Sequence, residues 1–196
     1  MRGFNYKKAV QALNLIAIKN GGSINKMKAI KLIWLSDRLH LRKFGRSITG
    51  DTYYALQNGP VPSATRDILE TSFFSSDIAT EYASEFIAII DKYHYKSKNQ
   101  MNLNVFSQTD KDILEIIFNS YKSLDQFQLS ELSHLFPEWQ KFQSALENGL
   151  SSRFSIDLAD FFINFKDDNN LFIESDDLLK ISKDIFEENS KLLSVF

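Results

Sequence analysis

The sequence has no cysteine and few residues that break helices: 0 Cys, 3 Pro and 7 Gly among 196 residues. Without cysteine the chain can form neither a disulfide framework nor a thiolate metal site. The scarcity of proline and glycine argues against a turn-rich β-sandwich. It favours helices, and 17 Phe provide large side chains for packing between them.

Long hydrophobic runs are also missing. No segment approaches the roughly 18 apolar residues of a membrane span. The N-terminal residues do not read as a secretory signal, because Gln11, Asn14 and Lys19 interrupt their apolar positions. A composition of 43% hydrophobic and 24% charged residues is that of a globular protein. We therefore expect a cytoplasmic protein with one domain over residues 1–196 and no membrane contact.

Charge is divided unevenly along the chain. Residues 1–50 hold 11 of the 23 Lys and Arg residues but only one of the 25 acids, Asp37. Such asymmetry indicates either a partner attracted by charge or two parts of one fold that neutralise each other. The sequence leaves both alternatives open.

Apolar periodicity and capping residues predict a mainly helical chain. Helices are expected at about 5–20, 26–44 (stopped by Gly45), 63–73, 110–123 (capped by Ser107, Thr109 or Asp110), 127–135, 157–162 (capped by Ser155) and 175–193. Residues 85–98 favour a strand or hairpin, with a helix as the alternative, and 46–58 reads as extended until Gly59 to Pro62 stop any strand. The expected fold class is α+β, mostly α-helical, with a small antiparallel β-sheet or hairpins.

The helix expected at 26–44 is apolar on two sides, which is typical of a central helix. Asp37 projects into the middle of one apolar arc, near Ile33 and Trp34. An unpaired carboxylate there would cost several kcal/mol. We therefore expect Asp37 to accept hydrogen bonds from backbone N–H groups or from a Lys or Arg of the following loop. A catalytic or partner-binding acid is the alternative.

Signatures of enzymes are absent: the chain has no phosphate-binding, dinucleotide-binding, zincin or nucleophile-elbow motif. The histidines, His40, His94 and His134, belong to different expected elements. Asp37 and His40 are three residues apart on one helix and could meet as an acid–base pair, but such pairs are common by chance. We expect no catalytic residue, no metal and no cofactor.

Binding is the favoured class of function. The basic stripe of the second helix (Lys28, Lys31, Arg38 and Arg42) could contact phosphates, which makes a DNA-binding regulator the alternative. However, leucines interleave with that stripe, so nucleic acid is not the favoured partner. For a protein partner, Arg38, Arg42, Tyr53 and Tyr54 are the candidate contact residues, because Tyr and Arg are frequent at interfaces.

Two stretches resemble the SocA-like Panacea domain of bacterial antitoxins and phage-associated proteins. The first, LIWLSDRLHLRKFGRSITGDTYYALQNGPVPS, contains Asp37, His40, Gly45, Gly50, Asp51, Tyr53, Ala55, Gly59 and Pro60. The second contains Glu131, Leu132, His134 and Trp139. The run at 56–58 departs from the family pattern. The likeness covers residues 24–140 and leaves 141–196 as an acidic helical extension.

The resemblance implies an antitoxin that neutralises a co-encoded protein toxin by direct binding. Some members are also implicated in delivering the toxin to a protease. The resemblance supplies no catalytic residues, and it implies a scaffold role for the motif positions. On this interpretation Gly45, Gly50 and Gly59 serve backbone geometry, whereas Asp37 and Asp51 satisfy buried donors.

Overall fold

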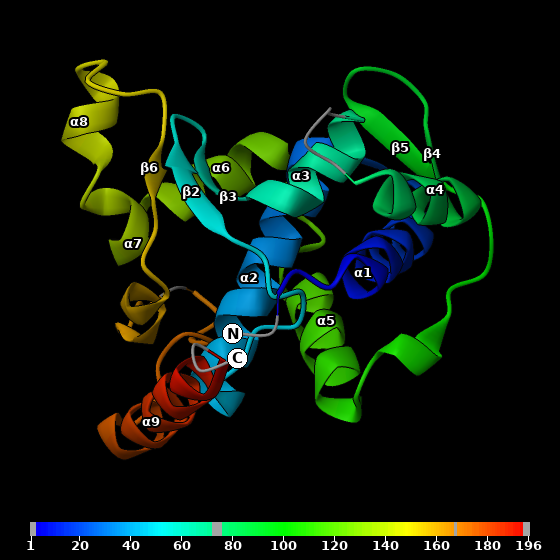
Figure 1. The fold of residues 1–196 in the computed structure, drawn as a ribbon. Coiled ribbons are helices and arrows are strands. Elements are labelled where there is room, and N and C mark those ends of the chain that lie inside the picture. The colour runs from blue at the N-terminus through cyan, green and yellow to red at the C-terminus, as the bar shows by residue number, and fades with distance from the viewer. Residues whose placement is uncertain (1–2, 72–75, 167, 194–196) are drawn as a thin grey trace.

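The computed structural model describes residues 3–71, 76–166 and 168–193. Helices dominate, and two three-stranded antiparallel sheets have the strand orders β1-β5-β4 and β3-β2-β6 (Figure 1). These observations confirm the α+β fold class. Among the described residues, no helix is both long and apolar enough to cross a membrane.

Helices and short strands are interleaved along the chain. The helices are α1 Tyr6–Lys19, α2 Lys26–Phe44, α3 Ser63–Glu70, α4 Asp77–Phe86, α5 Gln108–Tyr121, α6 Gln126–His134, α7 Pro137–Gln140, α8 Gln143–Glu147 and α9 Asp176–Leu193, with 3-10 turns η1 Leu103–Val105 and η2 Leu158–Phe162. The strands are β1 Ser23–Asn25, β2 Tyr53–Leu56, β3 Gly59–Pro62, β4 Ile87–Ile89, β5 His94–Ser97 and β6 Phe154–Ser155.

Helix α2 is the centre of the fold. Asn25 caps it by accepting two backbone N–H bonds, and Gly45 ends it in the left-handed conformation with φ 65°. Every residue from Ala29 to Arg42 is buried, and α1, α5, α6 and α9 all contact this helix (Figure 1). The expectation of a helix covered on two sides is confirmed.

The hairpin expected at 85–98 is confirmed as β4 and β5, with Ile89 opposite Tyr95. The expected strand stop at Gly59 is wrong, because β3 pairs with β2 and places Tyr53 opposite Pro62. Strand β3 lies at an edge of its sheet, where the missing N–H of proline interrupts no ladder.

Two expected helices differ from the structure, and one of the three candidate caps of α5 is confirmed. Helix α3 ends at Glu70, with Thr71 at φ 49°, and the expected end at Phe73 lies outside the described residues. Ser107 is the cap of α5 and forms a reciprocal capping box with Asp110. At 157–162 the chain forms a 3-10 turn capped by Asp157, because Ser155 pairs with β2 as part of β6.

The chain beyond residue 140 contributes to the same hydrophobic core as the N-terminal helices. Leu146, Ile156, Phe161 and Phe172 are buried in the cluster that contains Trp34 of α2. The aromatic rings interlock there: Phe136 lies 4.8 Å from Trp34 and 5.1 Å from Phe172 between ring centroids. The described part of the acidic segment, residues 141–166 and 168–193, therefore shares its core with α2.

Candidate functional site

Asp37 organises the turn that follows α2. Its carboxylate accepts the backbone N–H of Ile48 at 2.6 Å and of Thr49 at 2.9 Å, the Thr49 hydroxyl at 2.5 Å, and the Tyr53 hydroxyl. Burial raises the pKa of this carboxyl, and the hydrogen bonds from Thr49 and Tyr53 oppose that shift. The expected hydrogen bonding of Asp37 to backbone N–H groups is confirmed.

Asp51 performs the same task at the start of α3. The N-cap position is Pro62, which offers no side-chain hydrogen bond. Instead, the Asp51 carboxylate reaches across and accepts the N–H of Ala64 at 2.9 Å and of Thr65 at 2.8 Å, together with the Thr65 hydroxyl at 2.7 Å. Burial raises the pKa of Asp51 to about 6. Asp51 therefore satisfies buried donors, as expected.

The hypothesis of an Asp37–His40 pair is wrong. Both carboxylate oxygens of Asp37 are used by the 48–53 segment, and His40 turns the other way, towards α5. Its Nδ1 lies 2.7 Å from the Arg46 carbonyl oxygen, and its Nε2 lies 3.0 Å from Thr109 Oγ1 and 3.1 Å from Asp110 Oδ1. His40 fixes the end of α2 against α5.

Asp110 collects three basic side chains. Lys8 Nζ lies 2.5 Å from one carboxylate oxygen, whereas Arg46 Nη1 at 2.9 Å and His40 share the other. Burial raises the pKa of Asp110, but the hydrogen bonds from His40 and Lys8 outweigh it and hold this pKa well below its usual range. The cluster joins α1, the 45–51 turn and α5.

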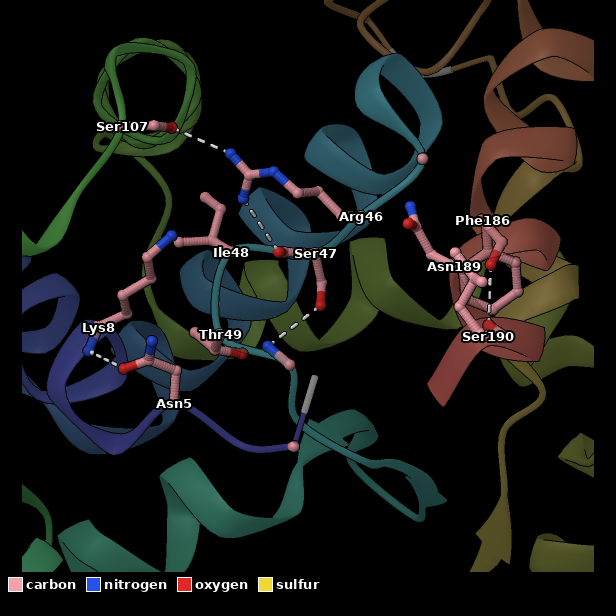
Figure 2. Close-up of a pocket in the computed structure, with 14 residues that line it drawn as sticks. Asn5, Lys8, Arg46, Ser47, Ile48, Thr49, Ser107, Phe186, Asn189 and Ser190 are labelled. Carbon is pink, nitrogen blue, oxygen red and sulfur yellow. Dashed lines mark hydrogen bonds between the residues drawn. The ribbon is translucent and has the colours of Figure 1, made fainter. Parts of the chain in front are cut away.

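A cleft of about 650 Å³ opens beside this turn. Figure 2 shows Asn5 and Lys8 on one side, the turn from Arg46 to Thr49 in the middle, and Phe186, Asn189 and Ser190 of α9 on the other side. Ser47 Oγ accepts the N–H of Gly50 at 3.1 Å, which closes the turn. Nowhere in the described part of the chain do three or more His, Asp or Glu residues form a possible metal site.

The structure buries Arg38 completely, and thereby corrects the expectation that it faces a partner. Its Nε donates to Glu138 Oε1 at 2.8 Å, and its Nη2 donates to the Ile163 carbonyl at 3.0 Å. The guanidinium carbon lies 4.7 Å from the Phe136 ring centroid and 5.0 Å from that of Phe172. The contacts of Arg38 are therefore made within the fold, although its Nη1 is buried without a hydrogen-bond partner among the described residues.

Arg42 is also buried and holds the segment that leads into α9. Its Nη1 donates to the carbonyls of Phe161 at 2.7 Å and Ile163 at 2.8 Å. Its Nη2 donates to Asn164 Oδ1 at 2.6 Å and to the Phe172 carbonyl at 2.9 Å. Burial, helped by nearby Arg38, lowers the pKa of Arg42 to about 9. The expected partner contact at Arg42 is therefore replaced by an internal clamp.

The basic first quarter of the chain is paired with acids from later segments. Five basic residues of the first quarter form ion pairs with later acids: Lys8 and Arg46 with Asp110, Lys19 with Glu115, Arg38 with Glu138, and Lys43 with Glu174. Lys31 is buried as well. For the five paired residues, the charge asymmetry is thus explained by neutralisation within the fold. The basic stripe does not offer phosphates a continuous surface.

Tyr53 and Tyr54 point to opposite sides of β2, as their adjacency predicts. Tyr53 is buried, bonds Asp37 and packs on Phe161, so it does not face a partner. Tyr54 is half-buried and lies 4.9 Å from the Arg153 guanidinium carbon, beside a second cavity of about 410 Å³. Of the four candidate contact residues, Tyr54 alone is partly exposed.

His134 and Trp139 form a stacked pair with ring centroids 3.9 Å apart. The indole N–H of Trp139 donates to the Leu56 carbonyl at 2.8 Å, which fixes α7 to β2. Burial, together with the charge of Lys31, lowers the pKa of His134. Both residues hold the end of the β2–β3 hairpin.

Lys31 is the residue that sequence reasoning placed least well. Its Nζ is buried and donates to the Pro60 carbonyl at 3.0 Å. Glycine is required at position 59 for two reasons. A Cβ there would lie 2.4 Å from this Nζ, and the backbone has φ 95°, which other residues rarely adopt. The sequence does contain a signal for the burial of Lys31, because this residue stands between Ile30 and Leu32 in a helix that is apolar on two sides.

Lys31 should make stability depend on pH. Burial lowers its pKa from 10.5 to about 7. Between these values the unfolded chain binds a proton that the folded chain does not, so the free energy of unfolding rises with pH and the gain is lost on return to pH 7. Relative to Lys31→Met, the wild type should gain about 1 kcal/mol per pH unit from pH 7 to 9.

Urea unfolding at pH 7, 8 and 9 measures this difference. The control is Lys180→Met, which removes an exposed lysine of α9 and should keep the wild-type dependence. Parallel profiles for the wild type and Lys31→Met would show that Lys31 is charged in the folded state.

Gly45 permits the close contact between α2 and α9. A Cβ there would lie 2.6 Å from the Ser182 carbonyl oxygen and 2.7 Å from Ile185 Cγ2. We expect Gly45→Ala to lower the free energy of unfolding by about 3 kcal/mol, of which backbone strain supplies about 1 kcal/mol. Gly149→Ala is the matched control, because Gly149 has φ 68° and nothing within 4 Å. It should lose only the strain. Equal losses would refute the contact argument.

A family model described as "Antitoxin SocA-like, Panacea domain" matches residues 30–140, more than half of the chain. The chain belongs to this antitoxin family. No curated protein and no solved structure matches it. The Panacea segment runs from α2 to the end of α7 and contains Asp37, Asp51 and the buried Arg38–Glu138 pair. Helix α1 and everything after α7 lie outside the match, although Arg42 binds the carbonyls of the later segment directly.

Proposed function

We propose that this Panacea-family protein is an antitoxin that neutralises a co-encoded protein toxin in the bacterial cytoplasm by binding it directly. The family match over residues 30–140 carries the proposal, since antitoxin membership implies a cognate toxin. The geometry supports binding over catalysis. The conspicuous polar groups of the motif, Asp37, Asp51 and His40, are buried and hydrogen-bonded to the fold itself.

On this proposal the Panacea motif builds a scaffold, and the surface around it contacts the toxin. A tight complex needs roughly 800 Å² of surface from each partner. The scaffold presents Tyr54 with Arg153 on the outer side of β2, and the cleft between the 45–50 turn and α9. Delivery of the bound toxin to a protease is a further step that would follow the same binding event.

Co-expression with the product of the adjacent gene tests the proposal. The adjacent gene alone should arrest growth, the pair should restore it, and the two proteins should copurify as a complex. The scaffold variant Asp37→Ala should lose rescue in proportion to its loss of folded protein. A pair that neither restores growth nor copurifies would overturn the antitoxin function.

The protease step has its own readout. If the chain acts as an adaptor, toxin levels should fall in cells that contain the chain, and inhibition of cellular proteases should restore them. Neutralisation with unchanged toxin levels would leave sequestration as the whole mechanism.

A further inference from the structure

Part of the apolar surface of helix α9 stays exposed in the folded protein. Leu179 and Ser182 face the protein, and Phe186 packs on Phe162 with ring centroids 5.8 Å apart. A second apolar stripe remains outside: Leu178, Ile181, Ile185 and Leu192 are 54%, 55%, 41% and 64% exposed. Spacings of three, four and seven residues align these four side chains along one face, over about 21 Å.

The stripe is held in a fixed place. Ile185 lies against the end of α2, where a side chain at Gly45 would collide with it. Lys43 pairs with Glu174 just before α9, and Arg42 binds the carbonyls that lead into it. Figure 1 shows α9 at the periphery of the molecule, with its axis alongside the end of α2. A surface fixed in this way can bind without first becoming ordered.

One edge of the stripe is acidic. At 100° per residue, Asp177, Asp184 and Glu188 lie within about 90° of the midline of the stripe. All three are exposed. The lysines of α9 at 180, 183 and 191 lie more than about 100° away on the same projection. The surface therefore combines large apolar side chains with a border of carboxylates.

The apolar stripe and its acidic edge together indicate which kind of partner binds there. In an antiparallel pairing of two copies the acidic edges would meet on the same side and repel. In a parallel pairing each acidic edge would face the other border of the stripe, where the projection places no lysine of α9 to attract it. Anionic lipid headgroups would be repelled as well. A protein segment with apolar side chains bordered by Lys or Arg satisfies both features.

We propose that the α9 stripe is the docking site of the toxin, and that the toxin contributes a segment of apolar side chains bordered by Lys or Arg. This inference rests on the proposed antitoxin function and assigns its contact surface. It places recognition on a helix outside the family match, which ends at residue 140. The Panacea motif then acts on recognition only by holding α9, through Gly45 and the two arginines of α2.

Calorimetric titration of the co-encoded toxin with paired variants tests the stripe. Leu178→Lys with Ile181→Lys should weaken binding by roughly 100-fold, because buried apolar anchors dominate affinity. The control, Phe127→Lys with Leu150→Lys, places the same charges at side chains that are 64% and 77% exposed elsewhere. It should bind within about threefold of the wild type. A milder pair, Leu178→Ser with Ile181→Ser, serves if the lysine variant unfolds.

The acidic edge has a kinetic readout. Asp184→Lys with Glu188→Lys should slow association by about tenfold at low salt and weaken its salt dependence. Asp112→Lys with Glu131→Lys changes two exposed acids of α5 and α6 and should have little effect.

The outcomes separate the two proposals. If the wild type binds the toxin and the stripe variants bind it equally well, the docking site is overturned while the antitoxin function stands. If the wild type does not bind the toxin, both are overturned. If the wild type alone sediments as a dimer that the stripe variants dissociate, the stripe is a contact between copies and the toxin site is overturned.

Discussion

Replacing Asp37 with alanine should lower the free energy of unfolding by about 4 kcal/mol. The substitution leaves the backbone N–H groups of Ile48 and Thr49 and the hydroxyls of Thr49 and Tyr53 without their acceptor in a buried site. Each orphaned buried donor costs about 1–3 kcal/mol, and the two hydroxyls can partly reorient. The loss of stability is therefore large, but smaller than the sum of the full costs of four orphaned donors.

Urea unfolding measures the effect of Asp37→Ala, with two variants for comparison. Tyr53→Phe removes one donor and leaves the carboxylate, so it should cost only about 1 kcal/mol. Asp112→Ala removes an exposed carboxylate of α5 and should stay within about 0.5 kcal/mol of the wild type. A loss below about 1 kcal/mol for Asp37→Ala would contradict its role as the acceptor that shapes the 45–51 turn.

The second large effect is expected at Glu138. Both side chains of the Arg38–Glu138 pair are fully buried. Glu138→Leu leaves the Arg38 guanidinium without its counter-charge, which should cost about 3–5 kcal/mol. Replacing both partners, as Arg38→Met with Glu138→Leu, removes the uncompensated charge and should recover most of that loss.

The double substitution distinguishes a charge effect from a packing effect. The carbonyl of Ile163 loses an Arg38 donor in the double variant but still accepts from Arg42 at 2.8 Å, so it is not orphaned. If the double variant is less stable than Glu138→Leu alone, Arg38 stabilises the fold through its other contacts, such as the rings of Phe136 and Phe172, and the argument from uncompensated charge is wrong.

Much of the scaffold follows from local signals in the sequence. Asn25 and Gly45 bound α2 where capping chemistry places them, and two-sided apolar periodicity identifies it as the central helix. Asp37 could be predicted to accept hydrogen bonds, because an unpaired carboxylate within an apolar arc is energetically costly. These inferences need only residues close together in the chain.

The sequence-based predictions are wrong where residues far away in the chain determine the environment of a side chain or strand. In the sequence, Arg38 and Arg42 resemble a surface stripe. In the structure, Glu138 pairs with Arg38, and the carbonyls of Phe161 and Phe172 accept hydrogen bonds from Arg42. His40 cannot be separated from Asp37 without knowing that Asp110 lies on its other side. The prolines of β3 are tolerated because that strand is an edge, a property of the whole sheet. Periodicity alone contains none of these contacts.

A titration of toxin activity with the purified chain tests the central claim most directly. If the chain neutralises by sequestration, residual activity should fall linearly with added chain and reach zero at a fixed molar ratio. The ratio should stay the same at longer incubation, because each chain is consumed by one binding event. Complete loss of toxin activity at a small fraction of that ratio would reveal turnover, and unchanged activity at excess chain would show that the toxin is not bound.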